Sequence, residues 1–177
     1  DFLPPDKLVE GPKPEKISAI SRLVKKVLPR SKGGIVVDGL EGLALHFPKC
    51  CAPVKGDRIV GFVARNRGVV IHRRDCPRVL DYDPAREVDV RWDDESQEFR
   101  PVQLCIYSAD LPGLLASVSQ TFHNSGVNIT AVNCCTSDDH TAENNFTVLV
   151  KDTVQLSNVI KKIEAIDGVK TVKRVSP

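Results

Sequence analysis

Apolar residues in the second half of the chain recur with the two spacings that distinguish strands from helices. Every second position is apolar in four segments and every third or fourth in two others, which predicts four strands and two helices. The strands fall near 102–106, 127–131, 146–150 and 169–175, and the helices near 114–122 and 156–163. The order strand, helix, strand, strand, helix, strand predicts a ferredoxin-like domain, in which both helices cover one face of an antiparallel sheet.

The preceding stretch has shorter apolar runs separated by glycine and proline, which favours a small β-rich unit. Runs at 59–63 and 69–71 predict a hairpin. Further strands are expected at 35–37, 43–45 and 88–92, with a short helix at 76–82. The acidic, polar residues 93–98 mark a boundary. We therefore expect an α+β chain, with a small β-rich domain over residues 33–95 and a βαββαβ domain over residues 96–177.

Residues 1–32 have a different character. Four prolines within residues 1–14 predict an extended connector. Apolar residues at helical spacing over 15–28 predict an amphipathic helix among basic residues, which Pro29 ends. Two interpretations of this helix stay open: a solvated connector and a contact with nucleic acid.

The composition fits a globular chain from a reducing compartment. Of the 177 residues, 41% are hydrophobic and 27% charged, and six cysteines in this background favour free or metal-bound thiols in the cytoplasm. No apolar run approaches the ~20 residues of a membrane span, so we expect no membrane contact. With 25 basic and 23 acidic residues, nucleic-acid binding would need a local patch. The chain contains no methionine, which predicts that it is part of a longer protein.

Two clusters of metal-ligand residues flank the predicted hairpin. Cys50 and Cys51 precede it, and His72 and Cys76 follow twenty intervening residues later. Three thiols and one imidazole match the donor set of a closed structural zinc site. Adjacent residues on a strand point to opposite faces, so Cys50 and Cys51 can share one ion only from an irregular turn. Buried cysteines that pack as small hydrophobes are the alternative.

The stretches 49–62 (KCCAPVKGDRIVGF) and 68–77 (GVVIHRRDCP) resemble the regulatory end of long RelA/SpoT-type stringent-response proteins. The resemblance implies a zinc-finger or conserved-cysteine domain followed by an ACT domain, with zinc held by the four residues above. The catalytic domains that make and degrade (p)ppGpp lie N-terminal to this region in that family, and no counterpart of them is found here. We therefore expect a non-enzymatic module that controls the balance of synthesis and hydrolysis.

ACT domains generally bind a small ligand, usually an amino acid, where the first strand turns into the first helix. Free N–H groups at a helix N-terminus favour a carboxylate there, and we expect Asp110 to cap this helix. Asn128 and Ile129 would face the turn from a neighbouring subunit or from the same one. The resemblance thus implies an allosteric amino-acid site, and its apolar residues Leu111, Leu114 and Ile129 would suit valine, leucine or isoleucine, although each residue also has a structural explanation. The candidate residues are Asp110, Leu111, Gly113, Leu114, Asn128 and Ile129.

Other partners follow from the same resemblance. Proteins of this type sense uncharged tRNA on the ribosome, and arginines near the hairpin would supply phosphate contacts with little base specificity. An ordinary solvated surface is the alternative. These arginines are Arg65, Arg67, Arg73, Arg74 and Arg78. We also expect a homodimer formed through the ACT domain.

A thiol redox switch is a further alternative. Cys105, Cys134 and Cys135, together with the predicted zinc thiols, would oxidise and change the dimer. A disulfide between the adjacent Cys134 and Cys135 would be strained.

Overall fold

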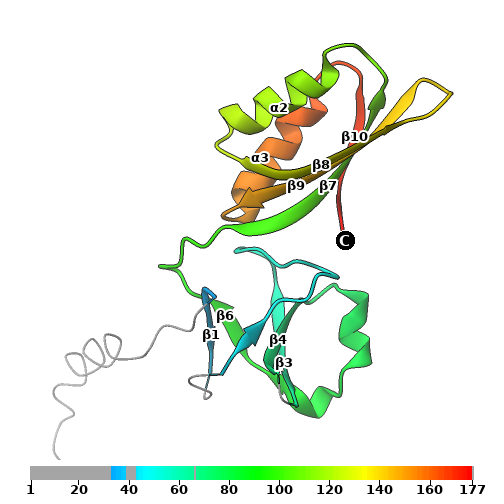
Figure 1. The fold of residues 1–177 in the computed structure, drawn as a ribbon. Coiled ribbons are helices and arrows are strands. Elements are labelled where there is room, and N and C mark those ends of the chain that lie inside the picture. Colours follow the sequence, from blue (N-terminus) through cyan, green and yellow to red (C-terminus); the bar gives the residue numbers. More distant parts are fainter. Residues whose placement is uncertain (1–32, 39–42, 66, 177) are drawn as a thin grey trace, which may run out of the picture.

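The computed structural model describes residues 33–38, 43–65 and 67–176, which form two domains in chain order (Figure 1). The helix predicted over 15–28 lies outside the described residues. The first domain is built almost entirely of strands, and the second combines strands with two long helices. The chain therefore has the α+β architecture expected.

The N-terminal domain contains two small sheets. One has four strands in the order β2-β4-β3-β5, and the other pairs β1 with β6. The predicted hairpin is confirmed as β3 with β4, in which Val60 lies opposite His72. The strands are β1 (Ile35–Val37), β2 (Leu45–His46), β3 (Ile59–Ala64), β4 (Gly68–Arg73), β5 (Glu87–Val88) and β6 (Val90–Trp92).

Two short 3₁₀ helices, η1 (Pro77–Asp81) and η2 (Pro84–Arg86), follow β4. The first takes the place of the short helix expected over 76–82. Proline at the first helical position suits both, because its N–H would have no partner there and its φ is already near the helical value.

The single strand expected over 88–92 is wrong, because the chain changes sheets at Asp89. β5 pairs with β3, whereas β6 pairs with β1, and the Asp89 carbonyl accepts from Asp38 N over 3.2 Å. Gly61 carries no side chain where Val88 and Val90 converge on it, so both valines pack on the domain core. The strand expected over 43–45 is also displaced, to Leu45–His46.

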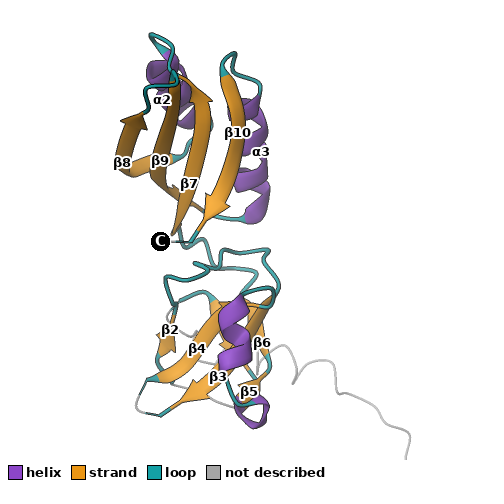
Figure 2. Ribbon diagram, turned by 90° about the vertical axis from the view of Figure 1, so that its right-hand side faces the viewer, coloured by secondary structure: helices purple, strands orange, loops and turns teal. Residues whose placement is uncertain are grey.

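The C-terminal domain is the ferredoxin-like fold that the spacing predicts. Its sheet has the order β10-β7-β9-β8, and both helices cover one face (Figure 2). All neighbouring strands are antiparallel. The elements are β7 (Arg100–Ala109), α2 (Leu114–Asn124), β8 (Asn128–Thr136), β9 (Thr141–Val150), α3 (Thr153–Glu164) and β10 (Val169–Val175).

Alternation along β7 and β9 places one row of side chains beneath the helices. Leu104 and Phe146 are fully buried in this row, and Phe146 meets Phe122 of α2 with ring centroids 5.2 Å apart. The carboxylate of Asp152 caps α3 by accepting from Gln155 N over 2.7 Å. The same core also contains Val54, which comes from the N-terminal domain and is fully buried.

Candidate metal centre

Three thiols and one imidazole meet at the end of the β3–β4 hairpin that lies away from its turn. Cys50 Sγ and Cys51 Sγ are each 3.6 Å from His72 Nδ1, and Cys50 Sγ is 3.8 Å from Cys76 Sγ. All four donor atoms lie within 4.8 Å of one another. The structure thus brings together the four residues predicted as ligands, in a cluster that can bind a metal ion.

The adjacent Cys50 and Cys51 share this cluster because the backbone turns sharply after them. Ala52 has φ +40°, a value that residues other than glycine seldom adopt. Its N–H donates to Pro48 O over 3.3 Å, which closes the turn. In an extended strand the two thiols would point to opposite faces, so this irregular turn is what aims both at His72.

Neighbouring groups fix the orientation of two ligands. His72 Nε2 lies 3.3 Å from Tyr82 Oη, and the Tyr82 ring stacks on Phe62 with centroids 4.7 Å apart. The backbone N–H of Arg73 donates to Cys51 Sγ over 3.4 Å. With Nε2 directed at the tyrosine, Nδ1 is the imidazole nitrogen that faces the thiols and is available to a metal.

Burial disfavours the charged forms of these groups. It raises the pKa of the Cys51 thiol to about 12 and also raises the pKa of Cys50, where the hydrogen bond with Cys76 acts in the same direction. It lowers the pKa of His72. Because a metal binds thiolates, metal binding here must displace thiol protons.

The loop that follows the two cysteines runs directly into the C-terminal domain. Val54 lies in that domain's core, and the carbonyl of Lys55 accepts from Thr153 N over 2.8 Å. Asp57 forms an ion pair with Arg174 of β10, with 2.9 Å between Oδ2 and Nη2. Only a few residues therefore separate the metal cluster from its contacts with the next domain.

Comparison with known proteins identifies both domains. Residues 35–93 match the RelA/SpoT RIS domain, and residues 96–174 match an ACT domain. The chain belongs to the RelA/SpoT family. It corresponds to the C-terminal regulatory region, because the matched domains are the RIS and ACT domains and not catalytic ones.

Relatives named for nucleotide synthesis support this assignment. The chain is 41% identical to a GTP pyrophosphokinase of Myxococcus xanthus over 160 residues, which cover 90% of the chain and 21% of the relative. It is 33% identical to the bifunctional (p)ppGpp synthase/hydrolase RelA of Mycobacterium tuberculosis over 152 residues, covering 84% and 21%. The chain thus spans about a fifth of the length of these relatives.

The predicted ligand-binding turn of the ACT domain joins β7 to α2. Asp110 does not cap α2 as expected: its N–H donates to His140 O over 2.9 Å, and the capping position is Gly113, with φ +83° and no side-chain cap. A left-handed residue at this position favours glycine. Leu111 is exposed beside it, whereas Leu114 is buried.

The other half of the predicted amino-acid site lies at the opposite end of the sheet. Ala109, at the end of β7, pairs with Thr141 of β9, whereas Asn128, at the start of β8, pairs with Leu149. Eight residues of extended strand separate these two positions of β9, a distance of roughly 26 Å. Within one chain, Asn128 and Ile129 therefore do not face the turn, which leaves the neighbouring-subunit arrangement.

The five candidate arginines occupy both ends of the β3–β4 hairpin. Arg65 and Arg67 flank its turn and are exposed, and no ion pair involving either occurs among the described residues. The other three lie at the metal end, each paired with a carboxylate. These pairs are Arg73 with Asp75, Arg74 with Glu87 and Arg78 with Asp81. They do not form the single patch that their sequence proximity predicts.

The three remaining cysteines lie in different environments. Cys134 and Cys135 are exposed on the edge strand β8, whereas Cys105 is buried on β7. Burial raises the pKa of Cys105, which disfavours the reactive thiolate. Nothing in this arrangement favours the redox switch over the other functions.

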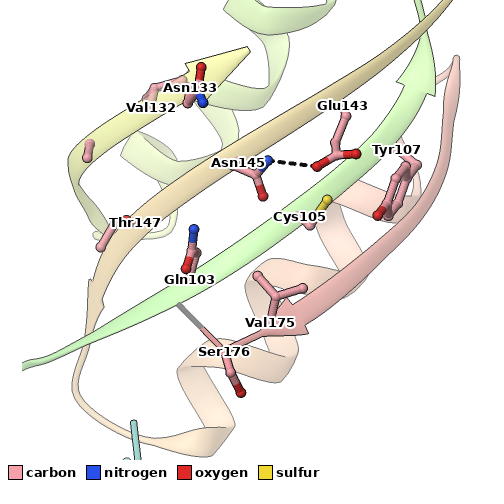
Figure 3. A pocket seen from close by; sticks show the side chains of 11 residues that line it. Gln103, Cys105, Tyr107, Val132, Asn133, Glu143, Asn145, Thr147, Val175 and Ser176 are labelled. Carbon is pink, nitrogen blue, oxygen red and sulfur yellow. Dashed lines mark hydrogen bonds between the residues drawn. The ribbon is translucent and has the colours of Figure 1, made fainter. Parts of the chain in front are cut away.

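The face of the ACT sheet opposite the helices carries polar side chains. A hollow of about 480 Å³ lies on it, where Asn145 Nδ2 donates to Glu143 Oε1 over 2.9 Å (Figure 3). Gln103 and Tyr107 of β7 line the same hollow. Such side chains allow this face to meet solvent.

Three residues at the cysteine–histidine cluster, or at its junction with the ACT domain, have no recognisable signal in the sequence. Tyr82 contacts His72, and Val54 joins the two domains by packing in the ACT core. Arg174 lies some 120 positions after the two cysteines and bonds the carbonyl of Ala52, which directly follows them. No spacing rule connects these residues to the candidate ligands, because the Tyr82 contact arises only when the N-terminal domain folds, and those of Val54 and Arg174 only when the two domains pack. In the part of the chain that the structure describes, no helix has the length and apolar character to cross a bilayer.

Proposed function

We propose that this chain is the regulatory region of a (p)ppGpp synthetase/hydrolase and controls the balance of the two activities. It would do so by binding the ribosome and uncharged tRNA, a branched-chain amino acid, or both. The observation that carries this proposal is the pairing of a RIS domain with an ACT domain in one chain, joined through a shared core at Val54. A joint of this kind would allow a ligand on one domain to affect the other.

The metal in the RIS domain is zinc in this proposal. A tetrahedral zinc ion with bonds of about 2.3 Å to sulfur and 2.0–2.1 Å to nitrogen requires sulfur atoms about 3.8 Å apart and sulfur–nitrogen distances of about 3.6 Å. Three of the six donor separations have these values, namely 3.8 Å between Cys50 and Cys76 and 3.6 Å from each of Cys50 and Cys51 to His72 Nδ1, and all six are within 4.8 Å. Four protein donors leave no open position, so the ion would be structural.

The amino acid would bind between two copies of the ACT domain. Asp110, Leu111 and Gly113 would come from one copy, and Asn128 and Ile129 from the other, since the two groups lie at opposite sheet ends in one chain. The edge strand β8 is exposed along nearly its whole length. An unpaired edge of this length is a template for a second strand, so pairing of β8 with its symmetry mate would form the homodimer.

Calorimetry on the purified chain tests this proposal, beginning with valine, leucine and isoleucine. We expect saturable binding that Asn128→Ala abolishes while the dimer persists in sedimentation. Asn133→Ala, on the same edge strand but away from its start, is the matched control and should bind normally. If none of the twenty amino acids gives a binding signal, the metabolite site is excluded and the ACT domain remains as a dimerisation unit.

RNA binding would depend first on Arg65 and Arg67, whose guanidinium groups have no carboxylate partner among the described residues. Replacing both with glutamine should weaken tRNA binding for all sequences alike and reduce its salt slope by about 1 for each lost phosphate contact. Arg74→Gln with Arg78→Gln is the control pair at the other hairpin end, where exposed ion pairs compete. Binding of tRNA that depends neither on the salt concentration nor on these substitutions would contradict the RNA role.

A further inference from the structure

Arg174, close to the end of the chain, reaches across the domain boundary to the turn that holds two metal ligands. Its Nη2 donates to the Ala52 carbonyl over 2.7 Å, and its two terminal nitrogens meet both carboxylate oxygens of Asp57 at 3.1 and 2.9 Å. The side chains of Arg174 and Asp57 are only 16% and 13% exposed. A two-pronged ion pair shielded from water in this way is directional and rigid.

We propose that Arg174 is a positioning residue of the metal centre, so that the ACT domain sets the metal affinity of the RIS domain. Ala52 directly follows Cys51, has φ +40°, and closes the turn that contains both cysteines by donating its N–H to Pro48 O over 3.3 Å. A backbone in this region of φ persists only when its surroundings hold it. The hydrogen bond from Arg174 to the Ala52 carbonyl is such a restraint, and it comes from the other domain.

A second set of contacts holds the far end of the same loop. Asp57 Oδ2, which pairs with Arg174, also accepts from Val54 N over 2.8 Å. Val54 is fully buried in the ACT core, and Lys55 O accepts from Thr153 N. The loop 50–57 therefore has metal ligands at one end and ACT contacts at the other, with Arg174 bonded to both parts.

This arrangement makes the coupling reciprocal. If docking of the ACT domain favours the ligating form of the turn, then a bound metal must favour docking by the same factor. Metal occupancy would thereby control how firmly the two domains are joined. The inference rests on the proposed occupation of the cluster by zinc, and its test separates the two claims.

The test compares zinc affinity in Arg174→Gln and Arg174→Lys with the wild-type chain, by competition against a chromophoric chelator. Outer contacts that orient ligands typically contribute 10- to 100-fold to metal affinity, so we expect a loss of at least about 10-fold in both. Lysine keeps the charge but lacks the planar fork that bonds both carboxylate oxygens of Asp57 while it bonds the Ala52 carbonyl. Lys170→Gln, an exposed change on the same strand, should leave the affinity unchanged.

Cobalt substitution supplies a readout that general destabilisation would not move. The visible d–d bands of bound Co²⁺ report ligand geometry, and we expect them to shift in both Arg174 variants while circular dichroism stays that of the folded chain. Asp57→Asn removes the ion pair but keeps the hydrogen bond from Arg174 to the Ala52 carbonyl, so this variant should lose less zinc affinity than Arg174→Gln. The double variant should be no weaker than Arg174→Gln alone, because the two residues act on one turn.

The outcomes are distinct. Folded Arg174 and Asp57 variants with wild-type zinc affinity and cobalt spectra would overturn the inference and leave the zinc site standing. A wild-type chain that binds neither Zn²⁺ nor Co²⁺ would overturn the zinc site and the inference together. If Arg174→Gln does not fold, Arg174→Lys and Asp57→Asn decide the question.

Discussion

Val54 offers a sharp test of how the two domains are joined. By sequence it belongs to the RIS segment, three residues after Cys51, but its side chain is fully buried in the ACT core with Val150, Leu156 and Val172. We predict that Val54→Ala destabilises the ACT domain although no residue of the matched ACT segment is changed.

The magnitude follows from the two methyl groups that are lost. At about 0.8 kcal/mol for each buried carbon, their transfer to water costs about 1.6 kcal/mol. A residual cavity of roughly 40 Å³ adds about 1 kcal/mol. The free energy of unfolding should therefore fall by about 2.5 kcal/mol, which corresponds to a melting temperature lower by about 5–10 °C for a chain of this size.

Native-state hydrogen exchange assigns this loss to a domain. In Val54→Ala the slowest amides of β7 and β9 should exchange roughly 60-fold faster, as about 2.5 kcal/mol requires. Val69→Ala is the matched control, because Val69 is equally buried but lies in the core of the RIS domain. Val69→Ala should speed hydrogen exchange first in β3 and β4.

One result would refute this reasoning. If Val54→Ala speeds exchange only in β3 and β4 and leaves β7 and β9 unchanged, Val54 does not contribute to the ACT core in solution. The packing of the two domains would then differ from the arrangement described above.

Three further predictions concern the metal cluster and the ligand-binding turn. Removing zinc with a chelator should lower the melting temperature and speed exchange in β3 and β4, and His72→Ala should reproduce the effect; an unchanged melting curve would exclude structural zinc. Tyr82→Phe keeps the stack on Phe62 but loses the contact with His72 Nε2, so zinc affinity measured by chelator competition should fall about 10-fold with the fold intact. Gly168→Ala should cost more than about 1 kcal/mol and weaken amino-acid binding in calorimetry, because φ is +89° and the added carbon would lie 2.7 Å from Leu111 and 2.9 Å from Leu114. Gly126→Ala, with φ +64° and open space around it, is the control that should lose stability and keep binding.

The sequence by itself determined the elements of the ACT domain. Apolar residues at every second position, as in Val102, Leu104 and Ile106, leave one buried face, and a strand is the backbone that satisfies this spacing. The helices at 114–124 and 153–164 follow for the same reason with a longer period. Local spacing is enough here because each element buries its own apolar side.

The sequence also determined the donor set of the candidate metal centre, since thiols and imidazole are chemically distinctive. It could not determine the turn that unites Cys50 with Cys51, because Ala52, which closes this turn, is also bonded by Arg174 from far along the chain. The switch of sheets at Asp89 was missed for a similar reason: it depends on the space above Gly61.

Only the tertiary structure decided how the parts act together. It separated Asn128 from Asp110, divided the arginines between two hairpin ends, and brought Arg174 to the cysteine turn. These relations link residues many positions apart, and local spacing carries no information about them. The sequence shows which chemistry is available because side chains are local, whereas packing within and between the two domains decides which side chains meet.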